Sequence, residues 1–175
     1  MNNNKPSWLA LAGLLSAFTL PIFPLNAAAV DNGKPCRSLI SGTYLATISN
    51  PDGSFASRAV LTFNSDGNLT RTDSNQGGVA GAFNAFTTSL GSWDCDDRRA
   101  LHATAINFSL PGVASAEGGI ARADYQASFN ARKQTVQGNI DVRFFNLTDN
   151  PYKTELPAPA ISVTFEGSRV PSRQQ

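Results

Sequence analysis

The chain contains few of the residues that enzymes most often use for metal-dependent or acid–base chemistry. Its 175 residues include one histidine, His102, two cysteines and one methionine. A metal site with two histidine ligands is therefore excluded, as is a relay of histidines. The sequence also lacks the Gly-x-Ser-x-Gly motif of serine hydrolases and the complete loop motif of an EF-hand. We expect neither a bound metal nor a cofactor.

The chain also lacks an excess of charge of either sign, with 14 Lys and Arg against 13 Asp and Glu. Binding to nucleic acid or to an anionic membrane surface generally requires a clear basic excess. We therefore expect no nucleic-acid partner. A small apolar molecule is the partner that the composition leaves open, and the sequence does not indicate an oligomeric state.

A long apolar run occurs once, at residues 8–25, preceded by one lysine and interrupted by two prolines. Its unbroken part is about a dozen residues long, whereas a membrane-spanning helix needs about 20. Ala27 and Ala29 then give the small-x-small pattern that signal peptidases recognise. The sequence predicts a cleaved signal peptide over 1–29 and a secreted or periplasmic mature chain. An uncleaved anchor is the alternative, and no later segment is expected to cross a membrane.

The mature chain keeps both cysteines, Cys36 and Cys95. Two cysteines in an exported protein usually form one disulfide bond. Such a bond closes a loop of about 60 residues, which the chain-entropy model values at about 4 kcal/mol. Two free thiols, or a metal site that uses both sulfurs, are the alternatives.

The second cysteine lies in the stretch SWDCDDRR (92–99), whose three aspartates resemble a set of metal ligands. If this stretch ends a β-strand, however, Trp93 and Cys95 share one face and Asp94 takes the other. The remaining carboxylates then lie in a turn, where the adjacent arginines neutralise them. We interpret the stretch as a disulfide-linked hairpin that pins the segment around Cys36 against the fold.

From residue 39 onward, short β-type stretches alternate with turn signals. Eight strands are predicted, over 42–49, 55–63, 69–74, 87–95, 100–110, 120–130, 135–147 and 161–170. Most connections are short, which favours antiparallel pairing, and no stretch of the mature chain has a helical period. The sequence thus predicts one all-β domain over 30–170 with a frayed tail at 171–175. An eight-stranded antiparallel meander barrel, which has no exposed sheet edges, is favoured over a two-sheet β-sandwich.

Two features of the chain resemble the lipocalins and their calycin relatives. Gly42-x-Tyr44 begins the first predicted strand, and Arg169 ends the last. In that group a Gly-x-Trp opens the barrel and an arginine from the last strand packs on the aromatic ring; here tyrosine replaces tryptophan. The layout is also similar to allene-oxide-cyclase-like and dirigent-like barrels, which hold an unstable or apolar small molecule and steer its ring closure or coupling. The resemblance implies a small eight-stranded barrel, and it assigns no catalytic residue.

Alternation along the strands gives each an apolar face, and many positions on these faces are alanines. An eight-stranded barrel with small inward residues has room for a small apolar ligand, although such residues also fit where a barrel tapers. Six residues on the apolar faces are candidate ligand contacts. They are Tyr44, Phe63, His102, Phe108, Tyr125 and Phe165.

Three polar side chains are candidates for chemistry in such a lumen. His102 is in phase with Phe108 on the predicted apolar face, so it is the best candidate for a general acid or base. A hydrogen-bonded histidine of the core or rim is the alternative. Arg71 and Asp73 are in phase with Leu69 and form a buried pair if Leu69 points inward. We favour an edge position for that strand, in which both charges face water.

The function that the sequence favours is binding of an apolar or aromatic small molecule in the lumen of the barrel. A cofactor-free isomerase, cyclase or coupling-guide enzyme is the second hypothesis. There, His102 or a tyrosine assists and the shape of the site does most of the work. A structural or interaction protein without a ligand is the third.

Overall fold

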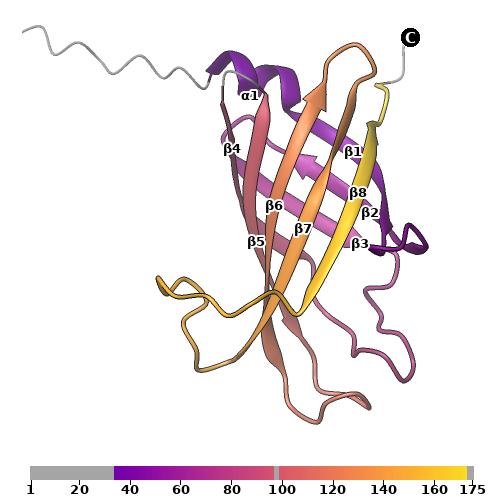
Figure 1. The fold of residues 1–175 in the computed structure, drawn as a ribbon, viewed down its shortest axis with the longest axis vertical. Coiled ribbons are helices and arrows are strands. Elements are labelled where there is room, and N and C mark those ends of the chain that lie inside the picture. Colours follow the sequence, from indigo (N-terminus) through magenta and orange to yellow (C-terminus); the bar gives the residue numbers. More distant parts are fainter. Residues whose placement is uncertain (1–33, 97–98, 173–175) are drawn as a thin grey trace, which may run out of the picture. The chain divides into compact units, whose positions relative to one another are not determined.

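Each strand has one apolar face and pairs with the next strand along the chain, as Figure 1 shows. The structure is a computed structural model that describes residues 34–96 and 99–172, so the predicted signal peptide lies outside the described residues. The elements are α1 (Lys34–Ile40), β1 (Gly42–Ser49), β2 (Phe55–Phe63), β3 (Asn68–Asp73), β4 (Ser89–Cys95), β5 (Ala100–Ser109), β6 (Gly119–Asn130), β7 (Thr135–Asn146) and β8 (Ile161–Arg169).

The sheet closes on itself because β8 pairs antiparallel with β1, placing Arg169 opposite Tyr44. All the other neighbours are also antiparallel and consecutive, so the strand order around the barrel follows the sequence. Closure of this kind satisfies the backbone groups that a sheet edge would expose. The predicted all-β barrel is confirmed, and the two-sheet sandwich is wrong.

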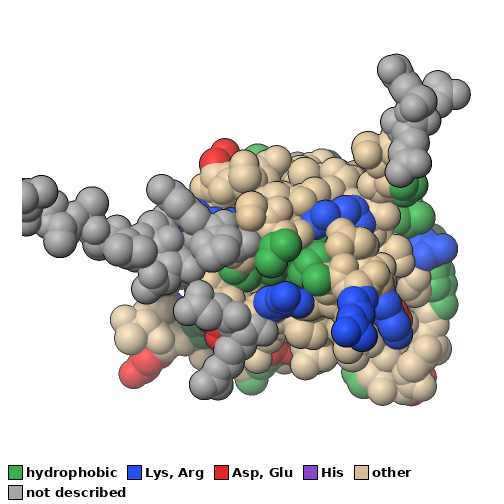
Figure 2. All heavy atoms as spheres, turned by 90° about the horizontal axis from the view of Figure 1, so that it is seen from above, with side chains coloured by type: hydrophobic (Ala, Val, Ile, Leu, Met, Phe, Trp, Pro, Cys, Tyr) green, Lys and Arg blue, Asp and Glu red, His purple; other side chains and the backbone are tan. Residues whose placement is uncertain are grey.

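The connections divide the barrel into two unlike ends. One end carries α1 and three short connections, and we refer to it as the α1 end. The other end carries the connections 50–54, 74–88, 110–118 and 147–160, and we refer to it as the loop end. Seen from the α1 end, Lys and Arg side chains surround a small hydrophobic area (Figure 2).

The helix α1 was not predicted from the sequence, and it covers the α1 end. Its Ile40 is completely buried, and the Ile40 carbonyl accepts a hydrogen bond of 2.6 Å from the hydroxyl of Tyr44. Arg169 lies over the rings of Tyr44 and Phe129, with its guanidinium carbon 5.4 and 5.5 Å from their centroids. The same guanidinium donates to the Tyr44 hydroxyl at 2.8 Å and to the Leu39 carbonyl. The last strand therefore holds the helix and the first strand together.

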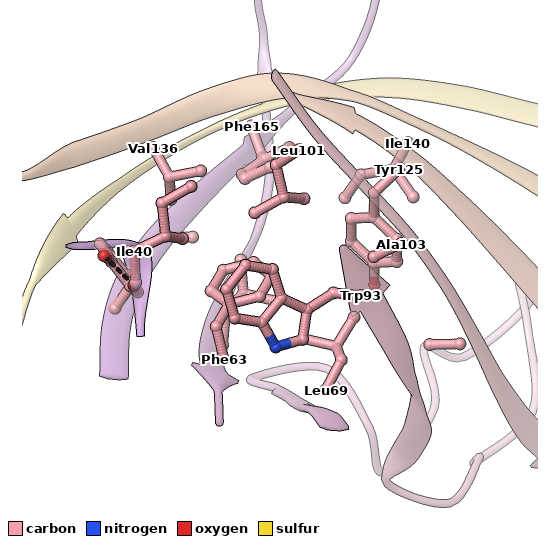
Figure 3. Packing of buried hydrophobic residues seen from close by; sticks show 14 of the residues in the cluster. Ile40, Phe63, Leu69, Trp93, Leu101, Ala103, Tyr125, Val136, Ile140 and Phe165 are labelled. Carbon is pink, nitrogen blue, oxygen red and sulfur yellow. Dashed lines mark hydrogen bonds between the residues drawn. The ribbon is translucent and has the colours of Figure 1, made fainter. Parts of the chain in front are cut away.

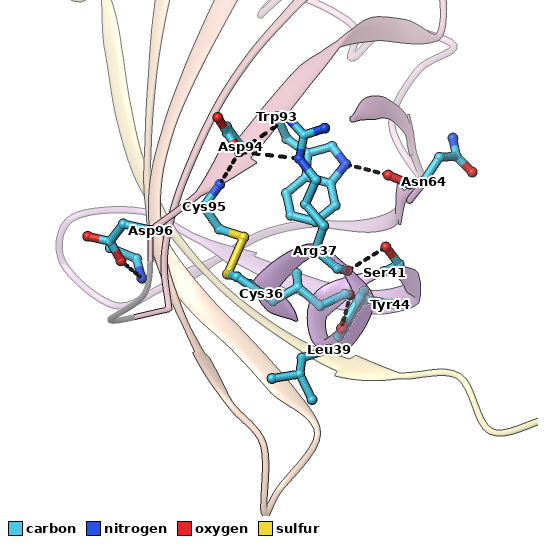
Figure 4. The surroundings of a disulfide bond; sticks show 12 residues. Cys36, Arg37, Leu39, Ser41, Tyr44, Asn64, Trp93, Asp94, Cys95 and Asp96 are labelled. Carbon is cyan, nitrogen blue, oxygen red and sulfur yellow. Dashed lines mark hydrogen bonds and ion pairs between the residues drawn. A yellow bond between two sulfur atoms is a disulfide. The ribbon is translucent and has the colours of Figure 1, made fainter. Parts of the chain in front are cut away.

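The disulfide bond is the second attachment of α1 (Figure 4). Cys36 of the helix is bonded to Cys95 at the end of β4. Arg37 and Asp94 add an ion pair of 3.2 Å beside it. Trp93 and Cys95 are buried while Asp94 is exposed, which confirms the predicted faces of this strand. The stretch around Cys95 is thus a disulfide-linked strand end.

Aromatic rings fill the interior behind α1 (Figure 3). The ring of Phe63 lies edge-on to Trp93 at 5.3 Å and to Tyr44 at 5.7 Å between centroids. Edge-to-face pairs of this kind add stabilisation beyond the area that they bury. The indole N–H of Trp93 donates to the Asn64 carbonyl at 2.9 Å, so its polar atom is satisfied. The α1 end of the barrel is a packed core.

Two glycines allow neighbouring strands to approach each other closely. A Cβ atom on Gly138 of β7 would lie 2.1 Å from the carbonyl oxygen of Gln126 and 2.6 Å from the Cα of Ala127, both on β6. A Cβ atom on Gly91 of β4 would lie 2.0 Å from the Thr104 carbonyl oxygen on β5. Contacts this short with backbone atoms are impossible, so glycine is required where the strands approach each other this closely.

We expect Gly138→Ala to destabilise the barrel by about 2 kcal/mol, because β6 and β7 must separate to admit the methyl group. The measurement is the free energy of unfolding in urea. Gly77→Ala is the matched control, since a Cβ atom there meets nothing within 4 Å. Equal stability of the two variants would contradict the close approach of β6 and β7 at Gly138.

We expect the double variant Cys36→Ser/Cys95→Ser to lose about 4 kcal/mol of unfolding free energy, because the unfolded chain regains the freedom of a long loop. Thermal unfolding of the native chain with and without a reductant gives the same comparison. An unchanged melting temperature after confirmed reduction would show that the bond contributes nothing to the fold.

Candidate functional site

The structure places four of the six candidate ligand contacts inside the barrel. Tyr44 and Phe63 belong to the packed core at the α1 end. Tyr125 and Phe165 lie further along the interior, with their ring centroids 6.1 Å apart. The hydroxyl of Tyr44 is already engaged by Ile40 and Arg169. Of the four, Tyr125 is therefore the one whose polar group faces the interior beyond the packed core.

The other two candidates, His102 and Phe108, are exposed. The predicted phase of this strand is wrong, since the buried residues of β5 are Leu101, Ala103 and Ala105. Two of these inward residues are small, and Ala103 lies beside the large ring of Tyr125 in the register of β5 with β6. The bulkier Ile106 and Phe108 face outward, which is the reverse of the usual pattern. His102 is therefore not in the lumen, and it cannot act as an acid or base there.

The interior polar group that the sequence analysis placed in water is the pair Arg71 and Asp73. Both lie inside the barrel, where their side chains are 12 and 3% exposed. Arg71 donates from Nε to Asp73 Oδ2 at 2.8 Å and from a terminal nitrogen to Oδ1 at 2.6 Å. This two-point contact is the strongest geometry for an arginine–carboxylate pair. The expectation that β3 is an edge strand is wrong, because barrel closure turns this face inward.

A third group completes this cluster from across the lumen. The remaining terminal nitrogen of Arg71 donates to the hydroxyl of Tyr125 at 3.1 Å, joining β3 to β6, which is not its neighbour in the sheet. Burial raises the pKa of the Tyr125 hydroxyl, although the charge of Arg71 acts in the opposite direction. Burial alone would lower the pKa of Arg71, but Tyr125 and Asp73 raise it overall. At neutral pH the cluster is thus a guanidinium held by a carboxylate, with a neutral phenol beside it.

The cluster retains unused hydrogen-bonding capacity. A guanidinium has five N–H groups, and three of those of Arg71 are engaged by Asp73 and Tyr125. On the neighbouring strands, the amide nitrogen of Asn107 donates to Ser89 Oγ at 3.0 Å. The Asn107 amide oxygen is buried and has no partner among the described residues. A buried unpaired acceptor is costly and usually has a partner that is a ligand or a water.

The wall facing this polar side of the lumen is apolar. In the register of β6, β7 and β8, Val142 and Ile161 share the inward face with Ala123, and Phe144 shares it with Ala121. Ala121 and Ala123 are buried, but Phe144 and Ile161 stay exposed although they point inward. Inward-facing positions near the loop end therefore remain in contact with solvent. In the register of the sheet, β3 to β5 present polar side chains to the interior there, and β6 to β8 present apolar ones.

The outer wall of the barrel carries broad hollows. One of about 960 Å³ runs across several strands, and its lining includes His102, Arg58 and Glu166. Another of about 590 Å³ lies over β4 to β6, and His102 lines it too. Both are lined mainly by the outward side chains of the sheet, and no group of three or more potential metal ligands occurs in the described parts of the chain.

The charged residues on the outside of β6 and β7 have a structural role. Asp124 accepts hydrogen bonds from Arg122 at 3.0 Å and from Arg143 at 2.8 Å. The two arginines in turn donate to the carbonyls of Pro151 and Pro157. This network fastens the connection 147–160 to the barrel wall, so these charges are already engaged.

Comparisons with protein-family models, with curated proteins and with solved structures found no match to this chain. Within the described residues, no helix is long and apolar enough to span a membrane. The candidate site is therefore identified by its geometry alone.

We expect Asp73→Ala to cost about 3 kcal/mol of unfolding free energy, because it leaves the charge of Arg71 buried without a counterion. Arg71→Met/Asp73→Ala should be less costly than the sum of its two single variants, since neither charge is left alone. Asp94→Ala, which breaks the exposed pair with Arg37, should cost less than about 1 kcal/mol. Urea unfolding at neutral pH measures the free energies of the double variant, of its two single variants and of Asp94→Ala. If the losses of Arg71→Met and Asp73→Ala add up to the loss of the double variant, the two groups do not interact.

Proposed function

We propose that the barrel binds an apolar or aromatic small molecule at its loop end, with a hydroxyl group of the ligand against Arg71 and Asn107. The observation that carries the proposal is the buried unpaired oxygen of Asn107, whose side chain bonds to Ser89, the residue opposite Arg71 in the register of β3 with β4. A hydroxyl both accepts and donates a hydrogen bond, so it matches an arginine N–H and an amide oxygen together.

The opposite wall supports the apolar part of this ligand. Ala121 and Ala123 provide a surface without bulk, and Val142 and Val163 are only half buried in the described structure. Binding of a flat apolar body against these side chains removes their surface from water, at about 25 cal/mol per Å². Concave apolar sites with a few fixed polar groups are the usual form of small-molecule sites.

We also infer a relationship to the calycin-like barrels and an exported location. The contact of Arg169 with the ring of Tyr44 supports the relationship, since it joins the first and last strands in the way expected for that group. The disulfide between Cys36 and Cys95 supports the location, because such bonds persist in oxidising compartments. The signal peptide over 1–29 remains a prediction from the sequence.

A cofactor-free isomerase, cyclase or coupling guide is the second candidate, and the position of Tyr125 favours it. A phenol kept neutral by burial, with Arg71 beside it, is suited to donate a proton or a hydrogen bond to an oxygen of a bound molecule. In this case Tyr125, and not His102, is the general acid. Tyr125→Phe then leaves binding largely intact and abolishes conversion of the bound molecule.

The test uses 2-naphthol and naphthalene as probes, followed by fluorescence titration. We expect 2-naphthol to bind at least about tenfold more tightly than naphthalene, because only the former satisfies the buried polar groups. Asn107→Leu should remove this preference. Native mass spectrometry of protein purified from its source should also show a bound mass.

Two variants control for the place of binding. Ala121→Leu should abolish binding of both probes by filling the lumen, whereas Leu90→Gln, on the outer wall, should leave it unchanged. Circular dichroism and the melting temperature confirm that each variant is folded. If neither probe binds and repeated preparations carry only the mass of the chain, the lumen is not a binding site and a structural role is left.

A further inference from the structure

The loop end carries an apolar feature that the proposed lumen site does not use. The connection 74–88 and the residues 108–116 project together from this end, and we refer to them as the lip. Five large hydrophobic side chains of the lip are exposed to solvent. They are Val79, Phe83, Phe108, Leu110 and Val113. Val113 is 99% exposed, so it contacts almost nothing of its own chain.

The two parts of the lip are fastened to each other. The side chain of Asn84 donates to the Ser115 carbonyl at 2.7 Å and accepts from the Ala114 N–H at 2.8 Å. Between the main chains, Leu110 N–H donates to the Ala85 carbonyl at 2.8 Å, and an isolated bridge joins Phe86 to Ser109. The exposure of the apolar side chains is therefore a property of an ordered structure. A soluble protein rarely holds so many apolar side chains in water at one place without a surface to cover them.

The lack of charged side chains in the lip indicates what kind of surface covers it. Neither 74–88 nor 108–116 contains Asp, Glu, Lys, Arg or His, and the one charged residue of the connection 110–118 is Glu117, next to the start of β6 and outside the lip. Interfaces between proteins usually surround an apolar centre with polar and charged groups that fix the orientation of the partner. The hydrocarbon region of a membrane has no such requirement and mainly penalises charge. A protruding, uncharged lip suits insertion into a lipid surface better than docking on a protein.

We propose that the lip inserts shallowly into a neutral lipid surface, with Val79, Phe83 and Val113 among the acyl chains. The internal hydrogen bonds of the lip lower the cost of bringing its backbone into the interface. The mouth of the lumen then faces the membrane, which is where apolar molecules accumulate. This proposal does not depend on the lumen site, because it rests on the exposed side chains alone.

Flotation with vesicles of phosphatidylcholine tests the proposal with the full mature chain. We expect the native chain to float with the vesicles, equally at low and at high salt, because no charge is involved. Val113→Asp should lower the apparent affinity about tenfold, and Val79→Asp/Val113→Asp should lower it further. These side chains are exposed, so the melting temperature should stay unchanged.

Leu90→Asp is the matched control, since Leu90 is more exposed than Val79 but lies on the outer wall of β4. It should float like the native chain. Absence of flotation, or equal losses for the Leu90 and Val113 variants, would overturn the proposal. So would binding that needs anionic phosphatidylglycerol and weakens with salt, which would instead indicate the basic α1 end. A dimer in light scattering that Val113→Asp dissociates would show that a second copy covers the lip.

Discussion

The pairing of β1 with β8 is the constraint on which the rest of the structure depends. It closes the sheet, and closure fixes an interior that side chains of eight strands must share. Arg169 secures this closure from the last strand, over the ring of Tyr44 and against the carbonyl of Leu39. The disulfide adds a link between the helix and β4. With one end covered in this way, any site inside the barrel must be reached from the loop end.

The interior is divided between two kinds of side chain. Large rings, including Phe63 and Trp93, fill the part next to α1, whereas the part nearer the loop end contains small side chains such as Ala121 and Ala123 beside the half-buried Val142. The pair Arg71 and Asp73 lies in this second part, with Tyr125 opposite. Replacing such a buried pair by apolar residues often costs little stability or even increases it. In the proposed site the pair is accordingly assigned to ligand binding and not to stability.

Much of the fold follows from the sequence. The turn pairs Asp52-Gly53 and Asp66-Gly67 mark hairpins, and alternation marks all eight strands to within a few residues. The helix α1 was missed, because seven residues with a proline near the start and no repeated apolar period carry little helical signal. It is held by contacts from Tyr44, Arg169 and Cys95, which are distant in the sequence.

The site was harder to predict for two reasons. The phase of β5 was misread because its larger apolar residues face outward; Phe108 contributes to the lip and Ala103 makes room for Tyr125. Arg71 and Asp73 were placed in water because their strand was expected at the edge of the sheet. Their phase with Leu69 was the available signal, and it was correct. Predictions from the alternation of apolar and charged residues thus failed at the lip and at the interior cluster, the two places where we propose binding.

The most direct test of the account is the nitrogen–proton NMR signal of the Arg71 side chain. We predict one arginine Nε–H signal, absent in Arg71→Lys, that exchanges slowly with water and shifts as 2-naphthol is added. Rapid exchange of every arginine Nε–H would show that the Arg71 cluster is not buried. A slowly exchanging signal that does not move in the presence of bound 2-naphthol would contradict its role as the polar wall of the site.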